Sequence, residues 1–155
     1  MAGGVHMTND ARALLPDITG RADVHDLVVD FYREVVFDDV LSPVFGEVAE
    51  VDWAEHIPKL IDYWCRVLFG DPGYRGAILR PHQRINELER FESAMFDRWY
   101  ELWSMSLDRR WNGPTADRAR SHAARIADVL SRRLTGVDWS PSDLPSDVVV
   151  LGEGR

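Results

Sequence analysis

The chain has 155 residues, 45% of them hydrophobic and 28% charged, which is the composition of a globular domain and excludes a disordered or fibrous protein. Acidic residues outnumber basic ones by 26 to 18, and a net charge of −8 argues against nucleic acid or an anionic membrane as partner, because both require clustered cations. The single cysteine, Cys65, excludes an internal disulfide and a CxxC redox pair. We therefore expect one soluble domain in the cytoplasm.

Residues 1–20 carry little pattern and are expected to form a flexible extension. A first helix is predicted over 21–37, because apolar residues recur there on one face at the helical period. The residues on this face are Val24, Val28, Phe31, Tyr32 and Val35.

A second helix is predicted from about residue 52 to just before Gly70. At helical spacing, His56 shares its face with Trp53, Leu60, Tyr63, Trp64 and Val67. Cys65 falls on the opposite face, where we expect a small packed side chain rather than a reactive thiol.

After a glycine-containing loop and a short segment around His82, a long helix is predicted up to residue 111, and residues 112–114 end it. One face of this helix carries Phe91, Met95, Phe96, Trp99, Leu102, Trp103 and Ser106. A last helix is predicted to begin at a Thr115 cap and to end at Gly136, and residues 137–155 have the composition of a tail. The predicted class is all-α, with four main helices.

No zinc-ligand spacing, di-iron motif or nucleophile elbow occurs, so the chemistry must come from polar groups set among apolar ones. Taken singly, His56, Tyr32 and Trp99 could each be ordinary core residues, and His82 a surface histidine. Taken together, a histidine in a short segment and another on a facing apolar helix are the parts of a haem site. We leave His25 and His122 as ordinary histidines outside such a site.

Six motifs, in this order and spacing, resemble those of the group III truncated haemoglobins over about 21–135. They are Phe31-Tyr32, Leu41-x-Pro43-x-Phe45, Trp53-x-x-His56, Tyr63-Trp64, Tyr74-x-Gly76 with His82 after it, and Trp99 with Leu102-Trp103. The resemblance implies a globin-like, two-over-two helical sandwich over 21–136 that holds a non-covalent haem b.

The resemblance also implies roles for individual residues. His82 matches the proximal iron ligand, and Tyr32, His56 and Trp99 match the distal polar trio that stabilises a bound gas. The residues expected to contact the haem are Phe45, Leu60, Tyr63, Trp64, Phe96 and His82.

Hydrogen bonds to a charged acceptor contribute about 1.5–3 kcal/mol each, so two distal donors would slow the release of O2. We therefore expect a globin that binds O2, NO and CO and uses them in redox chemistry, such as nitric oxide dioxygenation or peroxide activation, more than in oxygen transport. Its partners would be these gases and an unidentified reductase, and the chain would be a monomer or weak dimer. The alternative is a helical sensor or interaction module that keeps a globin-like fold with or without haem.

Overall fold

The computed structural model describes residues 9–43, 53–72 and 91–141, and no β-strand occurs within these ranges. In chain order the helices are α1 (Asn9–Ala13), α2 (Arg21–Phe37), α3 (Trp53–Phe69), α5 (Ser93–Arg110) and α6 (Pro114–Thr135). The predicted all-α class is confirmed. The bounds of α2 are those expected from the sequence, and α3, α5 and α6 differ from expectation by a few residues at most.

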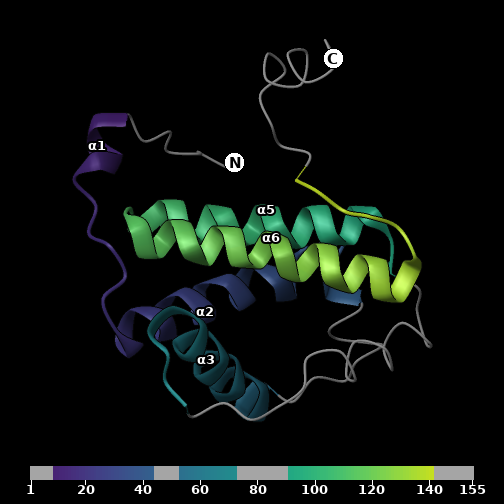
Figure 1. Cartoon of the computed structure of the whole chain (residues 1–155), viewed down its shortest axis with the longest axis horizontal. Helices are drawn as coiled ribbons and strands as arrows, with labels where there is room; N and C mark the ends of the chain where they lie inside the picture. Colours follow the sequence, from purple (N-terminus) through teal and green to yellow (C-terminus); the bar gives the residue numbers. More distant parts are fainter. Residues whose placement is uncertain (1–8, 44–52, 73–90, 142–155) are drawn as a thin grey trace.

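The helices form two pairs. The short corner 111–113 joins α5 to α6, and the two helices run antiparallel side by side as the upper pair in Figure 1. Below them, α2 and α3 form the second pair, with α2 in contact with α5 and α3 in contact with α6. This arrangement agrees with the expected two-over-two sandwich.

The interior is built on the predicted face of α2. Val24, Val28, Phe31 and Val35 of that face are fully buried, and so is Leu27, which was not among the predicted residues. Burying such a side chain contributes about 1.5–3 kcal/mol, so this stripe is a main source of stability. On α6, which contacts α5 and α3, the small side chains of Ala116, Ala119, Ala123 and Ala127 are all buried. Small residues at this spacing let the neighbouring helix α5 approach closely.

The start of α6 is capped by a residue far away in the sequence. The predicted Thr115 cap is wrong, because Pro114 already begins the helix and Gly113 precedes it. Asp17 instead accepts hydrogen bonds from the backbone N–H groups of Thr115 and Ala116, both at 2.9 Å. A Cβ at Gly113 would lie 2.5 Å from the Asp17 carboxyl carbon, so this close approach requires glycine. The predicted C-cap, Gly136, is confirmed in the left-handed conformation.

Segments before α2 and after α6 pack against the helices. Short helix α1, to which the sequence analysis gives no structure, places Arg12 2.8 Å from Asp108 near the end of α5. Ile18 is buried at 2% exposure. Beyond α6, the Trp139 ring is buried, and its Nε1–H donates to Asp97 on α5 at 2.9 Å. The predicted boundaries of the globin domain, at residue 20 with the N-terminal extension and at residue 136 with the C-terminal tail, stay predictions.

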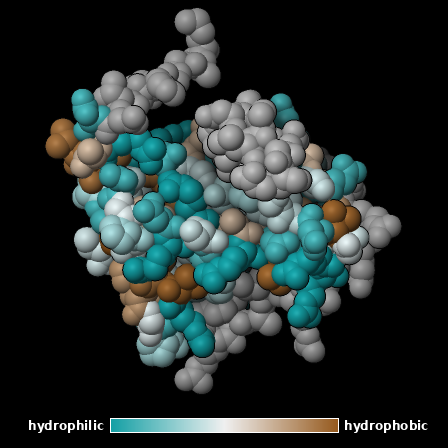
Figure 2. All heavy atoms as spheres, turned by 45° about the horizontal axis from the view of Figure 1, so that its top comes forward, coloured by the Kyte–Doolittle hydropathy of each residue, from teal (hydrophilic) through white to brown (hydrophobic). Residues whose placement is uncertain are grey.

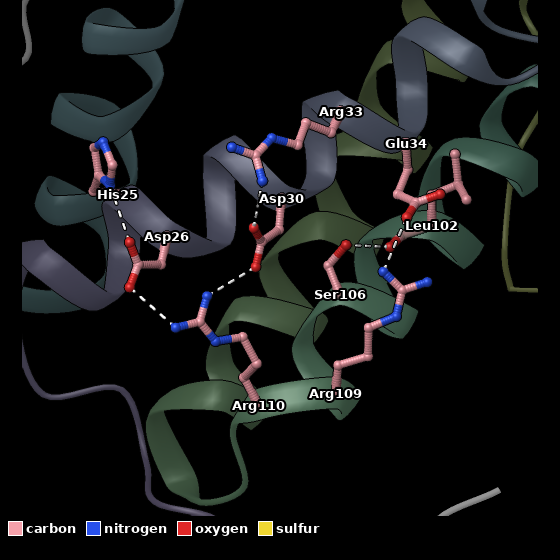
Figure 3. A network of polar contacts seen from close by, with 9 residues as sticks. All are labelled: His25, Asp26, Asp30, Arg33, Glu34, Leu102, Ser106, Arg109 and Arg110. Carbon is pink, nitrogen blue, oxygen red and sulfur yellow. Dashed lines mark hydrogen bonds and ion pairs between the residues drawn. The ribbon is translucent and has the colours of Figure 1, made fainter. Parts of the chain in front are cut away.

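Charged side chains link α2 to the end of α5 (Figure 3). Arg110 lies 3.1 Å from Asp26 and 2.9 Å from Asp30, and Arg109 lies 3.1 Å from Glu34. These pairs are partly exposed to solvent, so each contributes at most about 1 kcal/mol.

Hydrophilic residues cover most of the described surface seen in Figure 2, and hydrophobic residues interrupt it in separate spots. Among the described residues, none of the helices combines the length and the apolar character that a membrane span requires.

Candidate functional site

Tyr32 lies in the last third of α2, on the face that packs into the core, and only 8% of it is exposed. The side chain of Trp99 on α5 acts on its hydroxyl oxygen as a hydrogen-bond donor in the direction that lowers the pKa of Tyr32. Burial raises the pKa of the Tyr32 hydroxyl above its ordinary value, and the hydrogen bond opposes this shift only in part. Tyr32 therefore keeps its proton at physiological pH.

Trp99 fixes the direction of this hydrogen bond. An indole N–H can only donate, so the Tyr32 oxygen is the acceptor and the phenolic proton is not used in this contact. The Trp99 ring is half-buried and is held in place by two further rings. Phe31 lies 5.9 Å away in an edge-on arrangement, and Trp103 lies 6.3 Å away in a nearly parallel one.

His56 reaches the same place from α3. Its ring centroid lies 5.7 Å from that of Tyr32, and the two rings are nearly perpendicular. Trp53, one turn earlier on α3, lies 5.7 Å from His56 and 5.1 Å from Tyr32. The structure thus brings Tyr32 of α2 next to both other members of the predicted trio, one on α3 and one on α5. Their action on a bound gas stays a prediction.

Half-buried apolar side chains accompany these polar groups. Those on α3 and at the start of α5 are Trp53, Ile57, Leu60, Tyr63, Val67, Phe91, Met95 and Trp99. Side chains of this kind pack one side against the core and leave the other accessible. Such a surface can hold a large apolar cofactor. The polar groups of Tyr32, His56 and Trp99 can then form hydrogen bonds with a small ligand beside that cofactor.

The other predicted cofactor contacts fall into two groups. Leu60 and Tyr63 are half-buried on α3, whereas Trp64 and Phe96 are buried at 3% and 6% exposure. The Trp64 ring stacks on Trp103 with a centroid separation of 4.4 Å. Trp64 therefore packs into the interior between α3 and α5.

Phe45 and His82, the predicted haem-packing residue and iron ligand, lie outside the described residues. Both assignments stay predictions.

One residue near the site was missed by the sequence analysis. His122 of α6 was left as an ordinary histidine, but its Nε2 lies 2.6 Å from the hydroxyl oxygen of Tyr63. Burial lowers the pKa of the His122 imidazole, and the nearby Arg125 lowers it further. The signal was present in the sequence, because His122 is three residues after Ala119 and four before Ile126, on the apolar stripe of α6.

An ion pair beside the trio was also missed. Arg98 donates from Nε to the buried carboxylate of Asp38 at 2.6 Å, and the other carboxylate oxygen accepts from the N–H groups of Val40 and Leu41. The hydrogen bond to Asp38 raises the pKa of the Arg98 guanidinium. Because Arg98 precedes Trp99, this pair ties the site-forming part of α5 to the corner after α2.

No family model matches the chain. The group 3 truncated hemoglobin ctb of Campylobacter jejuni subsp. jejuni serotype O:2 is 31% identical over 107 residues, which cover 67% of this chain and 82% of that protein. The chain belongs to the group III truncated haemoglobins. Within this family, the crystal structure of a group III truncated hemoglobin from Campylobacter jejuni superimposes with a TM-score of 0.68 at 26% identity, covering 78% of this chain and 95% of the other.

The family and the geometry agree on the architecture. The likeness to a solved truncated hemoglobin agrees with the two helix pairs of this chain. The resemblance drawn from six short motifs is confirmed.

Proposed function

We propose that this truncated haemoglobin binds haem b and, at its iron, the small gases O2, NO and CO, and that it uses them in redox chemistry. The observation that carries the proposal is the meeting of side chains from three helices: the ring of His56 on α3 lies 5.7 Å from that of the buried Tyr32 on α2, and the Phe31 ring contacts both Tyr32 and Trp99 of α5. A partly buried group of polar side chains beside an apolar face suits the stabilisation of a small polar ligand.

The described residues fit a haem. The group is large, flat and apolar, and the half-buried side chains beside the trio offer it apolar contacts on α3 and α5. We propose that Leu60, Tyr63, Trp64 and Phe96 contribute to this wall, together with Phe45. His82 would supply the axial imidazole.

Haem b, when bound, would supply an iron that binds small diatomic gases, and His82 would hold that iron. Tyr32 retains its proton because burial raises its pKa, so it acts as a donor. Trp99 occupies an acceptor position of the Tyr32 oxygen and thereby orients the hydroxyl. His56 lies edge-on to the same ring and can donate or accept through either ring nitrogen.

The strength of these hydrogen bonds favours redox chemistry over transport. One hydrogen bond to a charged acceptor is worth about 1.5–3 kcal/mol, which corresponds to roughly 10- to 100-fold in affinity. Such gains act mainly by slowing release. A carrier must release its gas, whereas nitric oxide dioxygenation or peroxide activation benefits from a ligand that is held. Continued turnover would then require a reductase.

Absorption spectroscopy tests the proposal. The purified protein should show an intense violet band as isolated, and that band should shift on reduction and again under carbon monoxide. His82→Ala should lose the band, whereas Tyr100→Phe, a change elsewhere in the core, should keep it. A folded protein that stays colourless and takes up no added haem would refute haem binding and favour the sensor or interaction module.

Tyr32→Phe tests the distal role. We expect release of O2 to accelerate by roughly 10- to 100-fold, because one donor to a charged acceptor is lost. The measurement is stopped-flow release, with the reaction of the oxygenated protein with nitric oxide followed in parallel. Equal rates in the wild type and the variant would exclude Tyr32 as a donor to the ligand.

A further inference from the structure

Exposed apolar side chains gather where α2 ends. Phe37, the last residue of α2, is 86% exposed, and Val36 and Val40 near it are 36% and 40% exposed. Single exposed apolar residues are common on protein surfaces, but three within five positions of the chain form a patch of the kind found at interfaces. We call Val36, Phe37 and Val40 the corner patch.

The backbone that carries the corner patch is held in one orientation. The Asp38 carboxylate accepts hydrogen bonds from the backbone N–H groups of Val40 and Leu41, both at 3.1 Å. Its other oxygen accepts from Nε of Arg98 on α5 at 2.6 Å. The turn after α2 is therefore fixed both to the end of its own helix and to α5. A surface that is already ordered loses little conformational entropy when a partner docks on it.

An exposed side chain of α5 adjoins the corner patch. Two ion pairs cross from α2 to α5, Glu34 with Arg109 and Asp38 with Arg98. In sequence, the corner patch begins between the two acidic residues, and Met105, which is 41% exposed, lies between the two arginines. Met105 therefore belongs to the same stretch of surface, which the two ion pairs delimit.

Two opposite charges flank the corner patch and remain available to a partner. Arg33, one turn before Phe37, has 75% of its side chain exposed and reaches Asp30 only at 4.0 Å. Figure 3 shows it on the far side of Asp30 from Arg110. Asp39, two residues after Phe37, is exposed and forms no ion pair within the part of the chain that the structure describes. The patch thus has a cation on one side and an anion on the other.

We propose that the corner patch is a self-association surface, on which a second copy of this chain docks about a two-fold axis at Phe37. Such an axis brings the same patch of both copies together, so the patch must be complementary to itself. Here the axis places Arg33 opposite the partner subunit's Asp39, and the reverse pair forms by symmetry. The two phenylalanine rings meet between these ion pairs. This interface is separate from the gas-binding role and does not rest on it.

The size of the patch predicts weak association. Specific, stable interfaces bury about 1,200–2,000 Å² in total, which is more than the corner patch and Met105 provide. The net charge of −8 also makes two copies repel each other at long range. Because small interfaces are transient, we expect a dissociation constant of roughly 10–100 μM.

Sedimentation velocity of the full chain as isolated tests the association. Between about 1 and about 500 μM the protein should pass from monomer to dimer. Phe37→Asp should weaken the association by at least about 10-fold, because it places two carboxylates at the centre of the interface. Leu14→Asp is the matched control, since Leu14 is equally exposed at 87% but lies before α2, and it should change nothing. Circular dichroism checks that both variants fold.

A charge exchange tests the two-fold arrangement. Arg33→Glu and Asp39→Arg each turn both attractive pairs into repulsive ones, so each variant alone should remain a monomer. Mixed in equal amounts, the two variants should form a dimer about as stable as that of the wild type, because each new charge then faces an opposite one. A variant that had merely lost its fold would not recover on mixing.

A wild type that remains a monomer at the highest concentration overturns the proposal and leaves the corner patch to a different protein. Equal weakening by Phe37→Asp and Leu14→Asp also overturns it, because the association would then not be located at the corner patch. Variants of Arg33 and Asp39 that remain monomers when mixed exclude the two-fold arrangement.

Discussion

The two halves of α5 differ in how they are packed. Its second half is packed against the rest of the protein. Ser106 and Leu107 are at most 1% exposed, and Arg109 and Arg110 form ion pairs with carboxylates of α2. In its first half, Met95 and Trp99 are only half-buried. One helix thus serves as core at one end and lines the candidate site at the other.

Phe31 connects these halves. Its ring contacts Tyr32 at 4.7 Å and Trp99 at 5.9 Å in the candidate site, and Trp103 at 5.1 Å toward the closed core. All three contacts are edge-on, an arrangement favoured for aromatic rings. The buried core behind the half-buried site therefore positions its side chains.

The largest predicted effect compares the two halves directly. Leu107→Ala should lower the free energy of unfolding by about 3 kcal/mol, because a fully buried side chain leaves a cavity. Met95→Ala, in the site-lining half, should cost less than about 1.5 kcal/mol, since that side chain is only half-buried. Urea unfolding measures both. Equal losses would show that the halves are packed alike.

Asp38→Ala should cost about 2 kcal/mol. The change removes the partner of Arg98 and leaves the N–H groups of Val40 and Leu41 without their acceptor. Because Asp38 is buried, this loss should persist in high salt. Unfolding in low and high salt is the measurement. A loss that disappears in high salt would mean that the carboxylate acts only as a surface charge.

Asp17→Ala should cost about 1 kcal/mol at neutral pH through loss of the α6 cap. Burial acts to raise the pKa of Asp17, but hydrogen bonds from Thr115, Ala116 and Ile18 outweigh it, and the pKa lies below its ordinary value. The folded state therefore holds its proton less tightly than the unfolded state. This stability is present above a pH of about 4 and is lost as pH falls through the folded pKa.

Unfolding of the wild type, Asp17→Ala and Asp17→Asn at pH 7 and pH 3 tests this prediction. Asparagine keeps an acceptor oxygen but cannot titrate, so its variant should lose less stability on acidification than the wild type. A wild-type loss equal to that of Asp17→Asn would refute the link between this cap and pH.

The smallest effect on the free energy of unfolding is expected at the C-terminal end of α5. Arg110→Ala removes ion pairs with Asp26 and Asp30, yet all of these side chains are partly exposed, so the cost should be about 0.5 kcal/mol and should vanish in high salt. Arg33→Ala, whose contact with Asp30 is 4.0 Å, is a matched control with a smaller effect. A salt-independent loss would mean that the cation–π contact of Arg110 with Trp111 dominates.

The sequence predicted the helices well because their apolar spacing is continuous. The limits of α2 follow from one stripe of buried residues that begins at Val24 and ends at Val35. The start of α6 could not be found in this way, since its cap comes from Asp17, which lies 98 residues before Thr115. Local propensity favours Thr115 as a cap, and only the fold reveals the better acceptor.

For the site, family resemblance supplied the residues and the structure supplied their contacts. The resemblance selected Tyr32 and Trp99, but only the packing of α2 against α5 brings the two side chains together. His122 could not be singled out from the pattern of α6 alone, because its hydrogen-bond partner, Tyr63, lies 59 residues away on α3. The roles of Phe45 and His82 stay predictions from sequence, as does a cytoplasmic location.

The packing of Trp139 against α5 and α6 has a practical consequence. Its indole N–H donates to Asp97 of α5, two residues before Trp99, and its backbone N–H donates to Asp128 of α6. A protein shortened at Gly136, the predicted end of the globin domain, would lose both Trp139 hydrogen bonds, one to α5 and one to α6. Expression of the globin domain for crystallography or spectroscopy should therefore retain the chain to at least Pro141.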